Sequence, residues 1–441
     1  MFTIDFNTPI HVHFIGIGGI SMSGLAKILL DRHFTVSGSD AHISDLTTEL
    51  QQDGCIISYP QSADNITGDI DLVVYTAAIH PDNPELKAAV DAGIPTLTRA
   101  ELLGQIMKNY HTAVNVAGTH GKTTTTSMIT EILLAADADP TISVGGILNS
   151  IGGNIRVGRS DLFVTEACEY TNSFLHFFPK IGIILNVEED HMDFFKDIDD
   201  IRNSFHQFAA LLPADGALVI NQNIEGINSI TDGLDCKIIT YSERQPADYS
   251  ASEIRFDEIG NASFDLLRHG EYVDRITLIA VCEQLEIPLD IIKKGILSFT
   301  GTDRRFQYKG ERDGVTIIDD YAHHPTEIRA TLTSAQNYPH KDIWCIFQPH
   351  TYTRTKAFFD EFAEALSLAD HVVLADIYAA RETDTLGMSS AALTEKIKEL
   401  GTDAYYFPSF ENFVSEKCIH GDLLITMGAG DVVNIGEALL K

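Results

Sequence analysis

The sequence is poor in cysteine and in positive charge. Its 441 residues include six cysteines, and none of them forms a Cys-x-x-Cys pair. This scarcity argues against a disulfide framework and a zinc site, and it is typical of a reducing compartment. Lysine and arginine number 31 against 63 aspartates and glutamates, which gives a net charge of -32. Such an acidic balance argues against a general affinity for nucleic acid or anionic membranes.

The sequence also lacks an apolar run long enough to cross a bilayer. Its first residues show neither the basic segment nor the apolar core of a secretory signal. We therefore expect a cytoplasmic protein without membrane contact. Hydrophobic residues make up 44% of the chain, which supports full cores. The length is typical of about three domains of ~150 residues each.

One stretch has the features of a phosphate-binding loop. An apolar run ends in Gly118-Thr119-His120-Gly121-Lys122-Thr123-Thr124, and a helical pattern follows. Backbone N–H groups and a helix N-terminus attract phosphate, while Lys122 adds a full charge and the Thr123 hydroxyl can hold a metal ion. The motif is a contracted form, because the usual pattern has a glycine where this chain has Val116. The alternative is a turn with a chance Gly-Lys-Thr.

Polar residues follow two further predicted strands of the same region. Glu166 ends one apolar run, and Asn186, Asp190 and His191 follow another. Because the carboxyl ends of parallel strands meet at one edge of a sheet, we expect these residues to converge on the nucleotide phosphates. A carboxylate suits Mg²⁺, so Glu166 is either a metal ligand or a solvated strand end. Mg²⁺ prefers oxygen, so the residues alone leave His191 open between a ligand and a hydrogen-bonded loop histidine.

A second strand–glycine loop–helix pattern opens the chain. Gly16, Gly18 and Gly19 let the backbone approach a diphosphate, and Asp40, after the next predicted strand, can meet a ribose. The third glycine of this fingerprint is replaced by Ser21. Three interpretations remain open: a nucleotide diphosphate site, the cofactor site of a hydride-transferring dehydrogenase, and a glycine turn without a ligand.

Small or charged residues follow predicted strands elsewhere too. Thr76 and Ala78 follow the third strand and are expected to line the crevice of the first glycine loop. In the last third of the chain four strands end in polar, aromatic or cationic residues, including Arg354 and Arg381. Cations are scarce in this chain, so these ends favour a binding face over ordinary loops. Arg305, before the first of these strands, is placed to reach the phosphate loop.

These features suit a reaction that cleaves one nucleotide while holding another. The natural reaction is ATP-driven condensation: a carboxylate attacks the γ-phosphate, and an amine displaces phosphate from the resulting acyl phosphate. Mg²⁺ and Lys122 would stabilise the charge on the transferring phosphoryl group. Domain closure would keep water away from the acyl phosphate.

Eight short motifs together resemble the Mur ligases. They span residues 13–20, 118–123, 165–167, 190–191, 303–306, 320–325, 348–350 and 376–382. The resemblance runs nearly end to end, and the Tyr-Ala-His-His-Pro and Gln-Pro-His elements are specific to members that use UDP-N-acetylmuramate and L-alanine. It implies an ATP- and Mg²⁺-dependent ligase of peptidoglycan synthesis, acting as a monomer or homodimer.

The resemblance also implies roles, position by position. The catalytic residues it implies are Lys122, Glu166, His191, His324 and Arg354. Those for ATP are Gly118, Thr119, His120, Gly121, Lys122, Thr123, Thr124 and Arg305. Those for the UDP-sugar and the amino acid are Gly16, Gly18, Gly19, Ser21, Asp40, Thr76, Ala78, Tyr321 and Arg381. Those for Mg²⁺ are Thr123 and Glu166 for one ion and His191 for a second.

We expect an α/β protein of three domains. A Rossmann-like domain for the UDP-sugar covers residues 1–109, and a P-loop ATPase-like central domain covers 110–300. A Rossmann-like domain for the amino acid covers 301–441. Within the central domain, 141–146 is predicted as a strand that runs into a glycine turn.

One element of the family is absent. Relatives carry a Gly-x-His-Asn…Asn segment that holds adenine and ribose, whereas here Leu278 leads straight into a helical pattern. We therefore expect weakened ATP binding, and a nucleotide-binding protein of the same fold with impaired catalysis is an alternative. An NAD-dependent oxidoreductase is a further alternative, but it leaves Lys122, Glu166 and the third domain unexplained.

Overall fold

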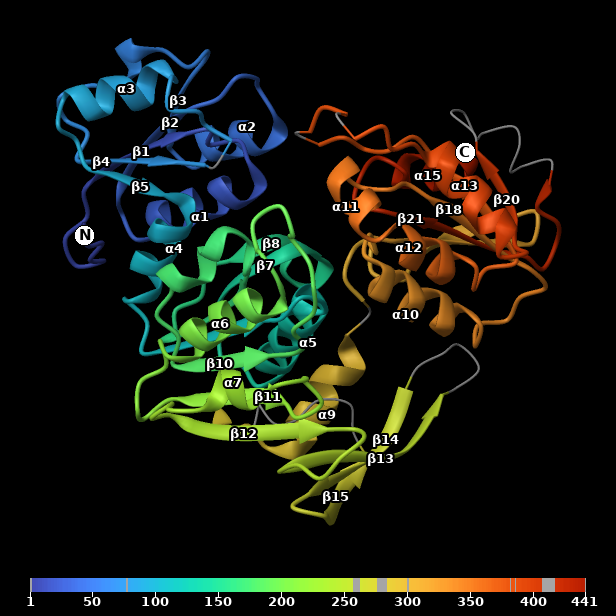
Figure 1. The fold of residues 1–441 in the computed structure, drawn as a ribbon. Helices are drawn as coiled ribbons and strands as arrows, with labels where there is room; N and C mark the ends of the chain where they lie inside the picture. The colour runs from blue at the N-terminus through green and yellow to red at the C-terminus, as the bar shows by residue number, and fades with distance from the viewer. Residues whose placement is uncertain are drawn as a thin grey trace. The chain divides into compact units, whose positions relative to one another are not determined.

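A computed structural model describes residues 2–76, 78–256, 262–275, 284–299, 301–380, 382–384, 386–406 and 417–440. The chain divides into two compact units (Figure 1). The first comprises Met1–Glu188, Ile198–Ser250 and Leu278–Phe299, and the second comprises Glu189–Asp197, Ala251–Thr277 and Thr300–Lys441. None of the helices described is both long and apolar enough for a transmembrane span. The five cysteines described have free thiols.

The first sheet of the first unit is parallel, with the strand order β3-β2-β1-β4-β5. Its elements are β1 (His11–Ile15), α1 (Ile20–Asp31), β2 (Thr35–Ser39), α2 (Asp45–Gln52), β3 (Ile56–Ser58), η1 (Ala63–Asn65), β4 (Leu72–Tyr75), α3 (Pro84–Asp91), β5 (Thr96–Thr98) and α4 (Arg99–Met107). The strand order reverses between β1 and β4, which places the ligand crevice of such a sheet at their carboxyl ends. This is the Rossmann-like arrangement that the glycine loop predicts.

The second sheet of this unit has the order β12-β11-β10-β6-β9-β7-β8. Its elements are β6 (Thr112–Ala117), α5 (Lys122–Ala135), β7 (Thr141–Leu148), η2 (Asn149–Ile151), β8 (Gly153–Arg156), β9 (Leu162–Ala167), η3 (Tyr170–His176), β10 (Ile181–Ile184), α6 (Ile198–Ala209), β11 (Ala217–Asn221), α7 (Asn228–Thr231), β12 (Lys237–Ser242) and α9 (Leu289–Ser298). Strand β6 is central and buried, and its neighbours β9 and β10 run parallel to it. The loop after β6 therefore opens at the switch point of the sheet.

The predicted glycine turn at residues 145–146 is wrong. Strand β7 continues through both glycines to Leu148, and the left-handed turn comes later, at Gly152 with φ 68°. Gly145 is needed for another reason, since a Cβ there would lie 2.7 Å from Oε2 of Glu166. The absence of a side chain at Gly145 therefore leaves space for the Glu166 carboxylate and does not indicate a turn.

The two sheets of the first unit pack through a tight seam. In α4, a Cβ added to Gly104 would lie 2.0 Å from the carbonyl oxygen of His176 in η3. Across the same unit, Arg159 donates two hydrogen bonds to Asp31 at 2.9 and 3.0 Å. Close backbone approach at Gly104 thus couples α4 of the first sheet to η3 of the second sheet.

We expect Gly104→Ala to destabilise the protein. Alanine favours a helix by ~1 kcal/mol over glycine, but the clash with a backbone carbonyl forces the seam apart at a cost of about 1–3 kcal/mol or more. Gly68→Ala is the matched control, because a Cβ there meets nothing within 4 Å. Chemical denaturation of both variants measures the difference. Equal stability of the two variants would contradict the tight seam.

In the second unit, β14 (Ala262–Arg268) and β15 (Glu271–Arg275) form an antiparallel hairpin. Strand β13 (Tyr249–Phe256) starts in the first unit, where Tyr249 and Ser250 pair with β12. The predicted junction after Leu278 lies outside the described residues.

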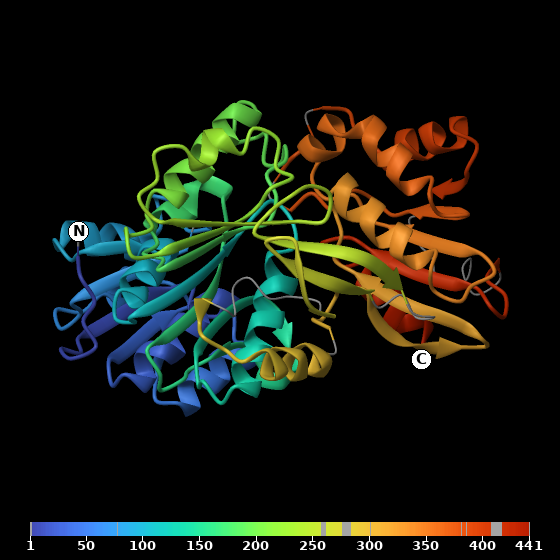
Figure 2. The same cartoon turned by 90° about the horizontal axis from the view of Figure 1, so that it is seen from below.

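The third sheet has the order β16-β17-β21-β18-β19-β20, and β16 alone among these strands pairs antiparallel. Its elements are β16 (Gln307–Arg312), β17 (Val315–Asp320), α10 (Pro325–Ala335), β18 (Ile343–Phe347), α11 (Tyr352–Ala357), α12 (Phe359–Leu366), β19 (His371–Leu374), α13 (Ser390–Glu399), β20 (Asp403–Tyr406), β21 (Leu423–Met427) and α15 (Val433–Leu439). Alternate residues of its strands pack under α10, α12 and α13 on one face and under α15 on the other (Figure 2). The sheet is therefore buried on both faces, as parallel sheets are.

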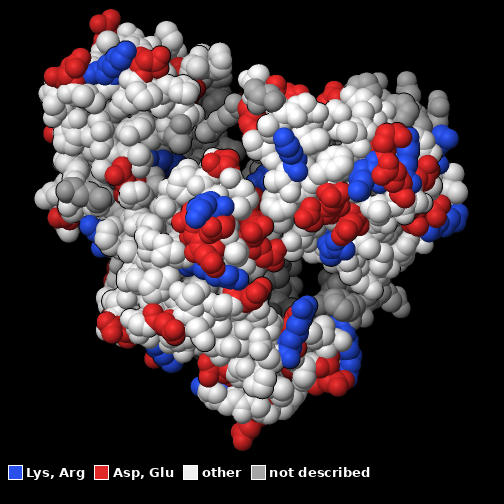
Figure 3. Space-filling model, in the orientation of Figure 1, with Lys and Arg blue, Asp and Glu red and all other residues white. Residues whose placement is uncertain are grey.

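Acidic side chains form several clusters on the visible face, which is otherwise mostly uncharged (Figure 3). Lysines and arginines lie next to some of these clusters (Figure 3). Lys180 and Asp215, for example, form an ion pair at 2.6 Å. Ion pairs of this kind thus hold several of the surface cations.

Candidate active site

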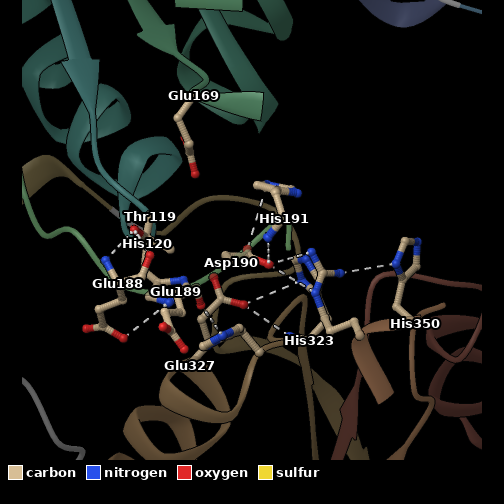
Figure 4. Close-up of polar contacts among 12 residues, drawn as sticks. Thr119, His120, Glu169, Glu188, Glu189, Asp190, His191, His323, Glu327 and His350 are labelled. Carbon is tan, nitrogen blue, oxygen red and sulfur yellow. Dashed lines mark hydrogen bonds and ion pairs between the residues drawn. The ribbon is translucent and has the colours of Figure 1, made fainter. Parts of the chain in front are cut away.

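The phosphate loop joins β6 to α5 in the first unit. Gly118 (φ 142°) and Gly121 (φ 82°) take conformations that L side chains disfavour. Asn186, which the sequence placed at the phosphates, braces the loop instead: its Oδ1 accepts from the N–H of His120 at 2.7 Å, and its Nδ2 donates to the His120 carbonyl at 3.1 Å. Glu188 also donates its N–H to the Thr119 hydroxyl at 2.9 Å (Figure 4). The loop is therefore held by the Asn186 side chain and by the Glu188 main chain, both outside it.

Lys122 extends over its own loop. Its Nζ donates to the carbonyl of Thr119 at 3.1 Å, to the carbonyl of Gly118, and to Oε2 of Glu169 at 3.0 Å. Burial by itself lowers the pKa of Lys122, but the neighbouring Glu169, Cys168 and Glu166 outweigh it, and the pKa is raised above its usual value. The lysine is therefore a charged group at the place where phosphates approach such a loop.

Sequence reasoning missed Glu169. Its carboxylate is buried, with a side chain 3% exposed, and it forms the ion pair with Lys122. It stands three residues after Glu166, at the carboxyl end of the same strand. The signal that points to it is a second acidic residue at a strand end already predicted to face the phosphate loop.

Thr123 and Glu166 form an oxygen-lined pair. The Thr123 hydroxyl donates to Oε2 of Glu166 at 3.0 Å, and the N–H of Gly145 donates to Oε1 of the same carboxylate. A hydroxyl and a carboxylate are donors that Mg²⁺ accepts alongside water and phosphate oxygens. These two residues therefore fit one magnesium ion. His191, expected at a second ion, belongs to the other unit.

The glycine loop lies after β1, next to the loop after β4. A Cβ on Gly16 (φ 82°) would lie 3.3 Å from Cγ2 of Thr76, so the structure brings these two predicted residues together. Asp40 accepts a hydrogen bond from the N–H of Gly18 at 2.8 Å. Asp40, expected to meet a ribose, thus occupies a backbone N–H of the glycine loop in this structure.

The remaining candidates of the first unit lie around these two loops. Gly19 is the N-cap of α1, and Ser21 lies in its first turn, where its Oγ accepts from Arg99 at 3.1 Å. Thr124 lies in the first turn of α5, and Ala78 is exposed in the turn after β4. Each of them is at the carboxyl edge of a parallel sheet.

The second unit gathers another group of predicted residues around Asp190. Arg354 donates from Nε and Nη2 to one Asp190 oxygen, at 3.2 and 2.9 Å. Asp190 also caps the N–H of His191 at 2.7 Å, and His191 has a left-handed φ of 53° (Figure 4). Burial raises the pKa of Asp190, but Arg354, His191 and His324 lower it by more, to well below its usual range. Asp190 therefore stays ionised as the centre of this cluster.

His324 and Tyr321 follow β17 as predicted. His324 is the N-cap of α10, with Nδ1 accepting from the N–H of Thr326 at 3.3 Å, and its Nε2 lies 3.1 Å from the Glu189 carbonyl. The Tyr321 ring lies under the guanidinium of Arg305 at 5.3 Å, and Arg305 approaches Glu327 at 3.7 Å. Arg381 lies outside the described residues.

His323, next to this cluster, is expected to stay neutral in mildly acidic solution. Burial lowers its pKa to about 4, and Arg354 acts in the same sense, whereas Glu327 opposes both. In the unfolded chain histidine titrates near 6.5. The stability due to neutral His323 is therefore complete above pH 6.5 and is lost as the pH falls towards 4, by about 3 kcal/mol at most.

NMR titration of the imidazole signals measures this pKa directly, with His323→Gln identifying the resonance. A His323 signal that titrates near pH 6.5 in the folded protein would contradict the expected value. Asp320 works in the opposite direction, because burial raises its pKa to about 6. The NMR signal separates the two groups where a stability curve alone would not.

Comparison with known protein families agrees with this geometry. The model of the Mur ligase family catalytic domain matches residues 11–111, that of the Mur ligase middle domain matches 116–282, and that of the Mur ligase glutamate ligase domain matches 304–430. The chain belongs to the Mur ligase family. Mur ligases are ATP-dependent, as the phosphate loop predicts.

Individual Mur ligases match over the whole chain. The UDP-N-acetylmuramate–L-alanine ligase of Lachnospira eligens is 63% identical over 459 aligned positions and covers 100% of both chains. A crystal structure of UDP-N-acetylmuramate-alanine ligase from Thermotoga maritima has a TM-score of 0.80, with 27% identity and 98% of each chain covered. The MurF ligase of Thermotoga maritima in complex with ADP shares the fold, with a TM-score of 0.60, 14% identity, and 92% of this chain and 93% of that chain covered.

The alignment with the Lachnospira eligens ligase also shows a difference in length. It spans 459 positions, whereas this chain has 441 residues, so at least 18 aligned positions have no residue of this chain. A relative this similar therefore contains residues that this Mur ligase lacks.

Proposed function

We propose that this protein joins L-alanine to UDP-N-acetylmuramate, with cleavage of ATP to ADP and phosphate, in peptidoglycan synthesis. The observation that carries the proposal is 63% identity over the full chain to a ligase of that name. The two glycine loops of the first unit support it, because one suits ATP and the other a UDP diphosphate. The proposed setting is the cytoplasm, and the proposed form is a monomer or homodimer.

The first unit supplies the groups for phosphoryl transfer. Lys122 and the N–H groups at the start of α5 would hold the β- and γ-phosphates, where their charges oppose the developing negative charge. Thr123 and Glu166 would hold one Mg²⁺, which neutralises phosphate charge. The substrate carboxylate attacks the γ-phosphorus, ADP leaves, and the amine of L-alanine then displaces phosphate from the acyl phosphate. Holding both reactants in line contributes several kcal/mol.

The second unit supplies candidates for the amino-acid end. His191 is proposed for a second Mg²⁺, and Tyr321, His324, Arg354 and Arg381 for the alanine. Support comes from the cluster around Asp190, which brings His191, His324 and Arg354 together through short contacts and charge. Arg305 is proposed for ATP. The domain boundaries at residues 109 and 300 remain part of this proposal.

Phosphate release tests the function. The purified protein with ATP, Mg²⁺, UDP-N-acetylmuramate and L-alanine should release phosphate, and omission of either co-substrate should abolish the release. Mass spectrometry should detect UDP-N-acetylmuramoyl-L-alanine. Phosphate release in the absence of either co-substrate would contradict the proposal. Oxidation of NADH in place of phosphate release would also contradict it. The rates of phosphate release with glycine or serine in place of L-alanine measure the protein's selectivity for the amino acid.

A second candidate is a nucleotide-binding protein with impaired catalysis. It is favoured by the aligned positions that have no residue in this chain. The expected adenine-binding segment would precede residues 279–285, most of which lie outside the described residues. We expect ATP to bind more weakly than to the Lachnospira eligens ligase, measured by calorimetry on both proteins. Similar affinities would contradict the expectation.

A further inference from the structure

Arg99 is the first residue of α4, directly after β5 at the carboxyl edge of the first sheet. Its Nη1 donates to Oγ of Ser21 at 3.1 Å, in the first turn of α1 after the glycine loop. The capping box of Thr98 and Glu101 fixes the start of α4 and therefore the direction of the Arg99 backbone. The guanidinium thus lies beside the loop proposed for the UDP diphosphate.

Within the described residues, Arg99 forms no ion pair, and its one hydrogen bond goes to the neutral Ser21. Other arginines that the structure describes lie within 4 Å of a carboxylate, namely Arg32, Arg156, Arg159, Arg304, Arg305 and Arg354. Burial lowers the pKa of Arg99, which shows that its charge is partly removed from water. A partly buried cation without an anion is costly unless a ligand supplies one.

Arg99 is also electrostatically linked to the phosphate loop within the same unit. Burial raises the pKa of the Cys168 thiol, and Glu169 adds to that effect, whereas the charges of Lys122 and Arg99 both oppose it. Cys168, directly after β9, is therefore close to both cations.

We propose that Arg99 binds an oxyanion of the UDP-linked acid. Two groups of UDP-N-acetylmuramate have this chemistry: the diphosphate and the lactyl carboxylate. The guanidinium presents a planar fork of donors that matches either group in a bidentate way. The hydrogen bond to Ser21 orients the Arg99 guanidinium towards the glycine loop in the absence of ligand. This inference rests on the proposed function, because it assumes that the first sheet takes UDP-N-acetylmuramate.

Calorimetry with the unaltered protein and three variants tests the proposal. Arg99→Gln removes the charge, Arg99→Lys keeps the charge and loses the fork, and Arg329→Gln controls for loss of an arginine at a half-exposed position. We expect Arg99→Gln to weaken binding of UDP-N-acetylmuramate by about 10- to 100-fold and Arg99→Lys by less. Arg329→Gln should leave the affinity unchanged. Circular dichroism melting checks that each variant is folded.

A second ligand identifies the oxyanion. UDP-N-acetylglucosamine carries the same diphosphate and no lactyl carboxylate. An equal loss of affinity for both ligands assigns Arg99 to the diphosphate, and a loss confined to UDP-N-acetylmuramate assigns it to the carboxylate. Unchanged affinity for both in folded Arg99→Gln would overturn the role of Arg99 alone. Failure of the unaltered protein to bind UDP-N-acetylmuramate would overturn the proposed function, and the role of Arg99 with it.

Discussion

Lys122→Met should lower the rate of substrate-dependent phosphate release by at least about 10²–10³-fold, the effect of removing one group that stabilises developing charge. Lys122 is the charged group over the phosphate loop, with its Nζ on two loop carbonyls and on Glu169. When ATP binds, its phosphates would replace these partners. No other lysine or arginine of the described phosphate-loop motif, residues 118–124, can take over this charge.

The same substitution has a structural cost that has to be separated from catalysis. Glu169 loses its ammonium partner in a buried place, and breaking a buried ion pair from one side costs about 3–5 kcal/mol. The double variant Lys122→Met with Glu169→Gln removes both charges and should recover much of the stability. Its activity should stay as low as that of the single variant. Recovery of phosphate release together with stability would contradict the catalytic role of Lys122.

Arg354→Met should destabilise the second unit by about 3–5 kcal/mol, because it leaves the charge of buried Asp190 without its guanidinium. The pair is 2.9 Å long between Nη2 and Oδ1, and the side chains are 10% and 8% exposed. Denaturant unfolding measures the loss. Arg329→Met is the control, since its 3.9 Å contact with Glu364 is at a surface where ion pairs contribute about 0–1 kcal/mol.

A double-mutant cycle separates the effect of Arg354→Met on stability from its effect on binding of L-alanine. Asp190→Asn combined with Arg354→Met should be more stable than Arg354→Met alone, because no buried charge remains unpaired. If Arg354 also holds the amino acid, the double variant should keep a raised KM for L-alanine. A normal KM for L-alanine in the stable double variant would limit Arg354 to positioning Asp190.

Much of the fold could be predicted from the sequence because its strands are buried on both faces. Largely apolar runs such as 113–117 and 343–347 indicate parallel strands, and the glycine loops that follow two of the strands mark the sheet edges. The end of the strand that begins at residue 141 is harder to predict, because the glycines at 145 and 146 usually indicate a turn. Gly145 instead allows the Glu166 carboxylate to approach the backbone closely, and only the three-dimensional contact between the two residues shows this.

The candidate site was predictable where a motif carries its own chemistry, as at Lys122, Thr123 and Glu166. Residues whose role depends on a distant partner were not. Asn186 was assigned to phosphate but braces the backbone of His120. Glu169 carries no motif, and only its position at the strand end that carries Glu166 points to it, whereas its ion pair with Lys122 is visible only in the structure. Arg99 carries no motif either, and its proposed role depends on its contact with Ser21 and on the lack of an ion pair within the described residues.

The most direct test of the account is a crystal structure with a non-hydrolysable ATP analogue and Mg²⁺. The account predicts the terminal phosphate beside Gly121, within hydrogen-bond distance of Nζ of Lys122, with the metal ion on Thr123 and Glu166. Nζ should then have left the carbonyls of Gly118 and Thr119. A terminal phosphate bound anywhere else, or a nucleotide held at the loop after β1 instead, would contradict the assignment of the central sheet to ATP.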